Sequence, residues 1–112
     1  METTELKNIA AQIRRDCLRM VYAVKSGHIG GALGCADFFT SLYFKHLKHD
    51  AKSFTVEGKN QDHFYLSNGH ISSVFYSTLA RCGYFNVKEL STFRIYGTRL
   101  QGHPCVENEQ AV

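Results

Sequence analysis

The sequence predicts an α/β fold that is mostly helical in this segment, with one short strand. Apolar residues recur at helical spacing in several segments, and one short aromatic stretch, residues 63–66, has the composition of a strand. The chain has 112 residues, enough for one modest domain, and its apolar content of 44% is enough to build a core. No composition shift or linker divides it, so we expect a single partial domain over residues 1–112.

The first expected element is an amphipathic helix of about five turns. It should end near Lys25, because Ser26 and Gly27 follow and form a turn signal. Polar and basic side chains occupy its other faces, which indicates a solvated surface. The apolar positions that define the buried face are Ile9, Ile13, Cys17, Met20, Val21 and Val24.

A glycine-rich loop, residues 26–31, separates this helix from a second one, expected from about Gly34 to Leu47. The apolar residues of the second helix cover more than one face, so we expect it to be well buried. Residues 48–61 are polar and aperiodic, as in a surface loop. The aromatic residues 63–66 then form the expected strand, and Ser67, Asn68 and Gly69 follow as a turn.

A third helix should begin at His70 or Ile71 and end at Gly83, which is well placed as a C-terminal cap. Asn86 and Glu89 have the spacing of a capping box and predict a short fourth helix that ends at Gly97. The tail, residues 98–112, shows no periodicity and is expected to be irregular.

Charge and cysteine usage restrict the class of protein. The formal net charge is only +3 and the basic residues are scattered, which favours solvated helix faces over a nucleic-acid surface. No stretch has the apolar length of a membrane span, and no signal peptide is visible. The four cysteines lie far apart without zinc-type spacing, so we expect free thiols in a cytoplasmic protein and no metal ligands in this chain.

Three Gly-His pairs are the main functional signal: Gly27-His28, Gly69-His70 and Gly102-His103. With nine glycines and six histidines, random order would give roughly half of one such pair. Glycine permits close approach of the backbone to a ligand, and histidine adds a donor, an acceptor or a titratable group. We therefore expect the three histidines to converge on one site; the alternative is that the pairs are ordinary turns with surface histidines.

The second pair follows the expected strand and opens the expected third helix. A strand, a tight turn and a helix present the amides of the helix N-terminus to an anion, and Ser67-Asn68-Gly69-His70 lies at this junction. The segment is neither a Walker loop nor a dinucleotide-binding fingerprint. A phosphate group is therefore the expected ligand here.

These motifs, taken together, resemble the N-terminal part of the transketolases. The resemblance is carried by Ser26-Gly27-His28-Ile29-Gly30, by residues 62–70 ending in Leu66-Ser67-Asn68-Gly69-His70, and by Gly102-His103-Pro104, in the family's order and with similar spacing. It extends from about Ile9 to Glu107. The deoxyxylulose-phosphate synthases are similar in outline, but usually differ around the second Gly-His pair, and are the less favoured relatives.

The resemblance implies a cofactor, a reaction and site residues. Transketolases use thiamine diphosphate with Mg²⁺ to transfer a two-carbon ketol unit from a ketose phosphate to an aldose phosphate. By resemblance, Gly69 and His70 would contact the cofactor's diphosphate. His28 and His103 would be catalytic and substrate-binding residues near the thiazolium and the donor hydroxyls. The expected partners are sugar phosphates, the C-terminal remainder or a partner subunit of a transketolase, and a second copy in a homodimer.

Two departures from the family pattern qualify this expectation. Ile29 stands where the family often has proline, a position expected to shape the loop. The family's Gly-Asp-Gly segment, which supplies the magnesium ligands, would lie downstream of Val112. We therefore expect the first section of a transketolase, inactive alone. The alternatives are a non-catalytic phosphate or sugar-phosphate binding module, a deoxyxylulose-phosphate-synthase-like segment, or a structural domain.

Overall fold

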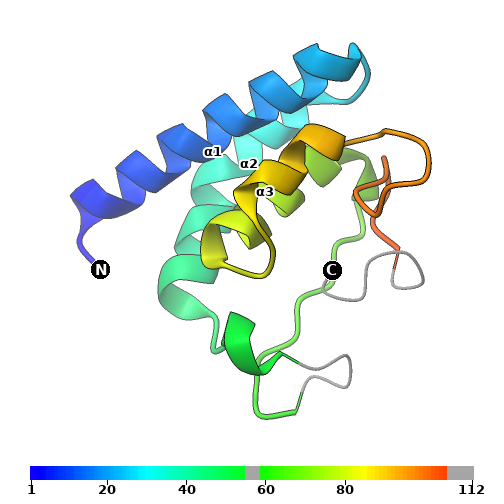
Figure 1. Ribbon diagram of the computed structural model, residues 1–112. Coiled ribbons are helices and arrows are strands. Elements are labelled where there is room, and N and C mark those ends of the chain that lie inside the picture. Colours follow the sequence, from blue (N-terminus) through cyan, green and yellow to red (C-terminus); the bar gives the residue numbers. More distant parts are fainter. Residues whose placement is uncertain (55–58, 106–112) are drawn as a thin grey trace.

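The computed structural model describes residues 1–54 and 59–105, and these form an arrangement of helices around one core (Figure 1). Three α-helices contact one another pairwise, and short helical turns fill the connections. In chain order the elements are α1 (Thr3–Val24), α2 (Ile29–Ser41), the π-helical turn η1 (Leu42–His46), η2 (Ala51–Ser53), η3 (Gly69–Ile71), α3 (Ser72–Cys82) and η4 (Val87–Thr92).

Helix α1 confirms the first expected helix and its end. Lys25 takes a left-handed conformation with φ of 50°, and its N–H donates to the Tyr22 carbonyl. This is the geometry in which a helix commonly terminates. The helix begins at Thr3, six residues before the first apolar position used to predict it. Its buried face includes Ile13, Cys17 and Met20, as the periodicity predicts.

Helix α2 corrects the expected start of the second helix. The helix begins at Ile29, so Gly30 and Gly31 belong to it and are not part of a loop. The reason is close packing: a Cβ on Gly31 would lie 2.6 Å from the Cγ2 of Ile71, so only glycine fits there. The π-helical turn η1 then continues to His46, close to the predicted end at Leu47.

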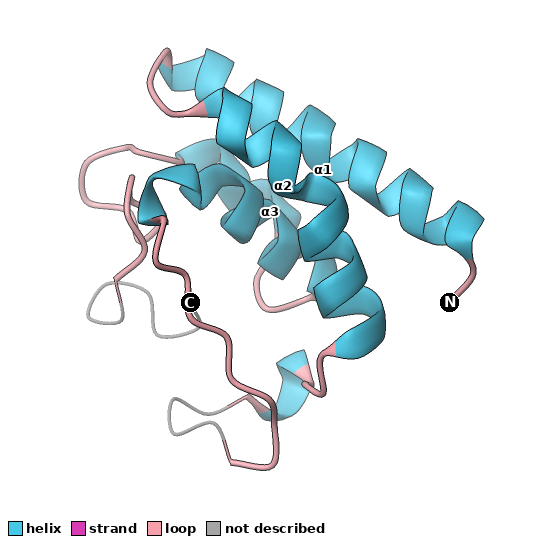
Figure 2. Cartoon of the chain, turned by 180° about the vertical axis from the view of Figure 1, so that it is seen from behind, coloured by secondary structure: helices cyan, strands magenta, loops and turns pink. Residues whose placement is uncertain are grey.

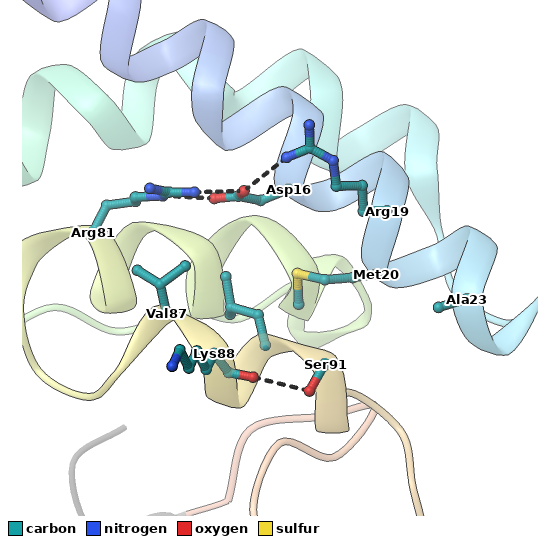
Figure 3. A pocket seen from close by; sticks show the side chains of 9 residues that line it. Asp16, Arg19, Met20, Ala23, Arg81, Val87, Lys88 and Ser91 are labelled. Atoms are coloured by element: carbon teal, nitrogen blue, oxygen red, sulfur yellow. Dashed lines mark hydrogen bonds and ion pairs between the residues drawn. The ribbon is translucent and has the colours of Figure 1, made fainter.

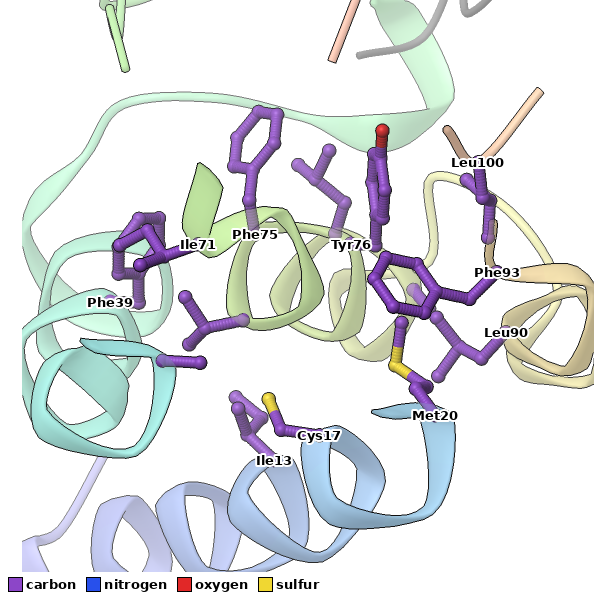
Figure 4. Packing of buried hydrophobic residues seen from close by; sticks show 14 of the residues in the cluster. Ile13, Cys17, Met20, Phe39, Ile71, Phe75, Tyr76, Leu90, Phe93 and Leu100 are labelled. Carbon is purple, nitrogen blue, oxygen red and sulfur yellow. The ribbon is translucent and has the colours of Figure 1, made fainter. Parts of the chain in front are cut away.

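The most buried helix is α3, whose residues 72–80 are all buried between α1, α2 and η4. The second helix is less buried than expected, because the Phe38 side chain is 60% exposed on α2. The core combines apolar side chains from every α-helix and from the segment after η4 (Figure 4). Its largest members include Ile13, Phe39, Ile71, Tyr76, Phe93 and Leu100.

The expected strand at residues 63–66 is not formed in the described part of the chain, and Figure 2 shows this segment as loop. A strand requires a neighbouring strand with which to exchange ladder hydrogen bonds, and the described residues contain none. The aromatic residues pack instead as single side chains. The ring of Phe64 lies 5.5 Å from that of Phe39 and 5.7 Å from that of Phe75, whereas Tyr65 is 85% exposed.

The end of α3 is as predicted, and the fourth helix is shorter than predicted. Gly83 caps α3 in a left-handed conformation with φ of 96°. Asn86 accepts from the Lys88 N–H and opens η4, but η4 ends at Thr92 and not at Gly97. The capping box is incomplete because the Glu89 carboxylate is engaged by the guanidinium of Arg99.

All four cysteines are free thiols, as predicted, and burial raises the pKa of Cys17 to about 12. Among the residues that the structure describes, no helix combines the length and apolar character needed to cross a bilayer. The irregular tail is described only as far as Cys105, so residues 106–112 of the expectation lie outside the described part.

Candidate functional site

The first two Gly-His pairs meet at the beginnings of two helices. His28 is the residue immediately before α2, and His70 lies in η3, which leads directly into α3. Their imidazole rings are in contact, with centroids 5.1 Å apart and planes at 86° in an edge-to-face arrangement. Residues that are 42 positions apart in sequence are thus brought together.

Gly31 is what allows this approach. Because Ile71 is branched at Cβ and follows His70 directly, its methyl group cannot easily move away from α2. A side chain at position 31 would enter the space of that methyl, with a Cβ only 2.6 Å from Cγ2. The backbone of the first turn of α2 therefore packs directly on the Ile71 side chain of η3. This packing holds the two helix starts, and with them His28 and His70, close together.

The third Gly-His pair lies against the second. A Cβ on Gly69 would lie 3.1 Å from Cδ2 of His103 and 3.6 Å from Cδ of Pro104. The structure thus brings the three predicted histidines to one region: His28 and His70 touch, and His103 packs on the glycine that precedes His70. The expectation that the three pairs converge is confirmed in this respect.

Two hydroxyl groups on α3 hold the third loop in place. Ser72 Oγ donates to the Gly102 carbonyl at 2.7 Å, and the Tyr76 hydroxyl donates to the Gln101 carbonyl at 2.5 Å. Both side chains come from the helix that His70 opens, so the second and third Gly-His pairs share one rigid support. Sequence reasoning did not predict these residues, because a serine and a tyrosine in an apolar helix give no sign of the distant carbonyls that they contact.

The electrostatics of this region favour an anion. The first turns of α2, η3 and α3 contain no acidic residue, and their N-terminal amides carry the positive end of the helix dipole. The three histidine side chains are exposed, so their ring nitrogens are accessible to a ligand. Within the described residues no group of three His, Cys, Asp or Glu side chains is arranged to hold a metal ion.

A separate cavity of about 340 Å³ lies between α1, α3 and η4 (Figure 3). It is lined by residues of α1, α3 and η4, and none of the three Gly-His pairs contributes to it. At its wall, Arg81 makes a two-bond ion pair with Asp16, with both N···O distances at 2.8 Å. The lining residues are Asp16, Arg19, Met20, Ala23, Arg81, Val87, Lys88, Leu90 and Ser91.

The buried Asp16 carboxylate at the wall of this cavity has a structural role. Its burial acts to raise the pKa of the carboxyl, but hydrogen bonds from Arg81 and Ser77 and the charge of Arg81 outweigh burial and lower the pKa below its ordinary value. The carboxylate is therefore charged, paired and only 5% exposed. A satisfied buried ion pair of this kind joins α1 to α3 and offers no free group for catalysis.

Comparison with known proteins shows the family of this chain and agrees with its fold. Residues 5–112 match the family described as the transketolase, thiamine diphosphate binding domain. Over 105 residues the chain is 38% identical to a transketolase of Rhodobacter capsulatus, covering 92% of this chain and 15% of that protein. It is 34% identical to one subunit of the apulose-4-phosphate transketolase of Phocaeicola vulgatus, covering 96% of this chain and 37% of that relative.

Solved structures give the same result. The transketolase of Campylobacter jejuni superposes with a TM-score of 0.84 at 32% identity, covering 96% of this chain and 17% of that one. A transketolase of Pichia stipitis in complex with sedoheptulose 7-phosphate superposes with a TM-score of 0.83 at 34% identity, covering 96% and 15%. The fold is thus that of a thiamine diphosphate binding domain. The chain belongs to the transketolase family, and it spans between about a seventh and two fifths of the length of these relatives.

Proposed function

We propose that this chain is the section of a transketolase that contacts the cofactor's diphosphate and carries two histidines of the reacting centre. The observation that carries the proposal is the meeting of the three Gly-His pairs at the N-terminal ends of α2 and α3. The resemblance predicts that these pairs serve one site, and their proximity in the fold supports that prediction.

The residues present fit the diphosphate of thiamine diphosphate. A diphosphate needs hydrogen-bond donors and positive potential without nearby carboxylates, and the segment that leads into α3 offers an exposed imidazole, the positive end of the helix dipole and no acidic residue. Gly69 and His70 would bind the diphosphate. The described residues do not fit Mg²⁺ by themselves, because no suitable cluster of ligands is present among them. Magnesium ligands are expected outside this chain.

The roles of His28 and His103 follow from their place beside His70. When bound, thiamine diphosphate would supply the nucleophilic carbon and the electron sink that transfer of a two-carbon unit requires. This chain's contribution is to hold imidazoles next to that centre. A neutral imidazole can hydrogen-bond a sugar hydroxyl and accept or return its proton, so His28 and His103 would bind the donor hydroxyls and move a proton there.

The same reasoning gives the substrate class and the setting. Sugar phosphates are the proposed substrates, in line with the Pichia stipitis transketolases that were solved with fructose 6-phosphate and sedoheptulose 7-phosphate. Activity would require the remaining transketolase sequence, either in one longer chain or in a partner subunit, with two copies forming a homodimer. A role in pentose phosphate metabolism in the cytoplasm follows from this proposal.

A ligand titration tests the diphosphate contact without needing activity. Proton–nitrogen correlation spectra of the 112-residue chain would be followed as inorganic pyrophosphate is added. We expect shifts at the amides of residues 69–72 and at the His70 imidazole, with a Kd of about 1 mM or weaker because the described residues hold no cluster of Mg²⁺ ligands. His70→Ala should reduce the affinity about 5- to 100-fold, which corresponds to the loss of one charge-assisted hydrogen bond.

His46→Ala is the matched control, because His46 is an exposed histidine on η1 with no role in the proposed site. This variant should bind pyrophosphate like the unmodified chain. Shifts confined to other helices, or equal affinity in the His70 and His46 variants, would refute the diphosphate contact. Binding of sugar phosphates in preference to pyrophosphate would favour a sugar-phosphate binding module instead.

A further inference from the structure

Arg94 occupies the space between the first and third Gly-His loops. Its guanidinium lies directly against Gly102, where a Cβ would be 2.9 Å from Cζ and 3.0 Å from Nη2. The same side chain reaches Gly27, where a Cβ would be 3.7 Å from Nε. Two glycines that each precede a site histidine therefore border one arginine side chain.

The backbone of Arg94 is itself fixed. The residue has a positive φ of 59°, which is uncommon for a residue other than glycine, and its N–H donates to the Leu100 carbonyl at 2.8 Å. This hydrogen bond closes the turn that leads from η4 to Gly102. The guanidinium also lies 5.6 Å from the centroid of the Phe93 ring, and Phe93 is a core residue. Arg94 is thus anchored to the core on one side and to the third loop on the other.

The contact with the first loop is a hydrogen bond. Nη1 of Arg94 donates to Ser26 Oγ at 3.0 Å, across 68 positions of sequence. Nε is buried and has no partner within the described part of the chain. The guanidinium therefore bridges the two loops through one hydrogen bond and through its packing on the two glycines.

We propose that Arg94 is a positioning residue that couples the first Gly-His loop to the third, so that His28 and His103 are held in one arrangement. The flat guanidinium fits the space left by the two glycines, which an ammonium on a flexible chain does not reproduce. Arg94 is not part of the contact between α2 and η3, where Gly31 packs against Ile71. The catalytic meaning of this coupling rests on the proposed function, but the coupling itself is a property of the free chain.

Gly102→Ala provides the test, because its new methyl group would displace the guanidinium and so release Ser26 in the other loop. Imidazole proton–nitrogen spectra would be recorded for the full chain, for Gly102→Ala, for Arg94→Gln and for the double variant. We expect Gly102→Ala to shift the His28 resonances, and we expect this shift to be lost in the double variant, where the guanidinium is already absent. Such non-additivity is the sign of an interaction that passes through the shared residue.

Arg99→Gln is the matched control, because Arg99 lies in the same turn but pairs with Glu89. When Gly102→Ala is combined with Arg99→Gln, the His28 resonances should shift as much as they do in Gly102→Ala alone. Ser26→Ala gives a second route that leaves all glycines in place, and it should shift the resonances of His103. Thermal melting would show that each variant is folded.

The coupling would be refuted if Gly102→Ala left the His28 resonances unchanged. It would also be refuted if Gly102→Ala shifted these resonances equally with and without the Arg94→Gln substitution. A His103 spectrum unchanged by Ser26→Ala would refute it as well. No ligand is present in these measurements, so a failure of pyrophosphate binding and a failure of the coupling are separate results. Arg94→Lys should not restore the coupling, since it keeps the charge but not the planar group.

Discussion

Ser72 and Ser77 belong to the same helix and are both fully buried, yet their hydroxyls stabilise different parts of the molecule. Ser72 donates to the Gly102 carbonyl in the third Gly-His loop, whereas Ser77 donates to the Asp16 carboxylate on α1. The beginning of α3 thus supports an open edge made of glycines and exposed histidines. The rest of α3 supports a closed interface made of apolar side chains and one ion pair. One helix therefore connects the candidate site to the part of the core that determines stability.

The α1–α3 interface and the Gly-His edge differ in whether their polar groups are already paired, and this decides which of them can bind a ligand. At the α1–α3 interface the buried Asp16 carboxylate is paired with Arg81 and hydrogen-bonded by Ser77, and these contacts lower its pKa. At the Gly-His edge the imidazoles are exposed and the helix N-termini carry no acidic residue. A region with satisfied groups contributes stability, whereas a region with accessible donors is available to a ligand.

The largest effect that we expect is a complete absence of ketol transfer by this chain alone. The chain spans 15% of the Rhodobacter capsulatus transketolase, and its described residues hold no metal-ligand cluster. We therefore expect the Gly-His edge to hold only part of the proposed site. An assay of the purified chain with thiamine diphosphate, Mg²⁺ and a ketose phosphate plus an aldose phosphate should show no product above a blank. Turnover by material free of contaminating enzyme would show that the edge is already a complete site.

Arg81→Met should cause the largest loss of stability, about 3 kcal/mol, because it leaves the buried Asp16 carboxylate without its ionic partner. Arg19→Met is the matched control. Arg19 lies 3.9 Å from the same carboxylate, but its side chain is 68% exposed, so its loss should cost less than about 1 kcal/mol. Chemical denaturation of both variants measures the difference. Equal losses would mean that the interface is not held by this pair.

The same pair predicts a pH dependence of stability. The folded pKa of Asp16 lies below its unfolded value of 3.8, so its contribution is present above pH 3.8 and is lost as the pH falls through the folded pKa. Arg81→Met removes the hydrogen bond and the charge of Arg81, which lower the pKa of Asp16, so this pKa should rise and acid should relieve the unpaired charge. We expect the free energy of unfolding of that variant to fall less on acidification than that of the unmodified chain. Parallel pH profiles would contradict this account.

Gly31→Ala should separate the two helix ends that carry His28 and His70. The added methyl would lie 2.6 Å from a branched side chain, and overpacking of this kind costs about 1–3 kcal/mol. Gly30→Ala is the adjacent control, because no atom lies within 4 Å of a Cβ there. That variant should be neutral or slightly stabilising, since alanine favours a helix over glycine by about 1 kcal/mol.

Melting temperatures and imidazole spectra distinguish the two glycine variants. Gly31→Ala should lower the melting temperature and shift both His28 and His70, whereas Gly30→Ala should leave the two imidazoles unchanged. If both variants behaved alike, the contact between α2 and η3 would not determine the spacing of the histidines. The comparison thus tests whether glycine in α2 serves the site or only the turn before the helix.

The elements that could be predicted from the sequence are those whose cause is local. Periodicity and a left-handed cap determine the ends of α1 and α3, and both ends were predicted correctly. The start of α2 was predicted wrongly, because Gly31 is used for contact with Ile71 and not for a turn. The strand at residues 63–66 was also wrong, because strand formation depends on a neighbour that local composition does not reveal.

The same distinction applies to the candidate site. The excess of Gly-His pairs was enough to predict that the histidines converge, because it is a property of the sequence itself. The supporting residues were not predictable, because each acts on a group far along the chain. Ser72 and Tyr76 contact carbonyls 30 and 25 positions away, and Arg94 reaches across 68 positions to Ser26.

Substitutions of the two serines of α3 test the comparison most directly. Ser72→Ala removes the donor to the Gly102 carbonyl and should cost about 0.5–1.5 kcal/mol. Its main consequence should be greater motion of residues 101–105, because that loop loses one of its two hydroxyl anchors on α3. Ser77→Ala removes a donor to a charged group and should cost more, about 1.5–3 kcal/mol, without changing that loop.

Denaturation and backbone relaxation measurements on both variants give the two readouts. Stability should fall more in Ser77→Ala, whereas motion at the third Gly-His loop should increase only in Ser72→Ala. Ser77→Ala should thus have the larger effect on stability, and Ser72→Ala the larger effect on loop motion. This result is expected if the beginning of α3 supports the candidate site and the rest of α3 supports the core. If the loop became mobile in Ser77→Ala as well, the candidate site would depend on the α1–α3 interface, and the two regions would be one cooperative unit.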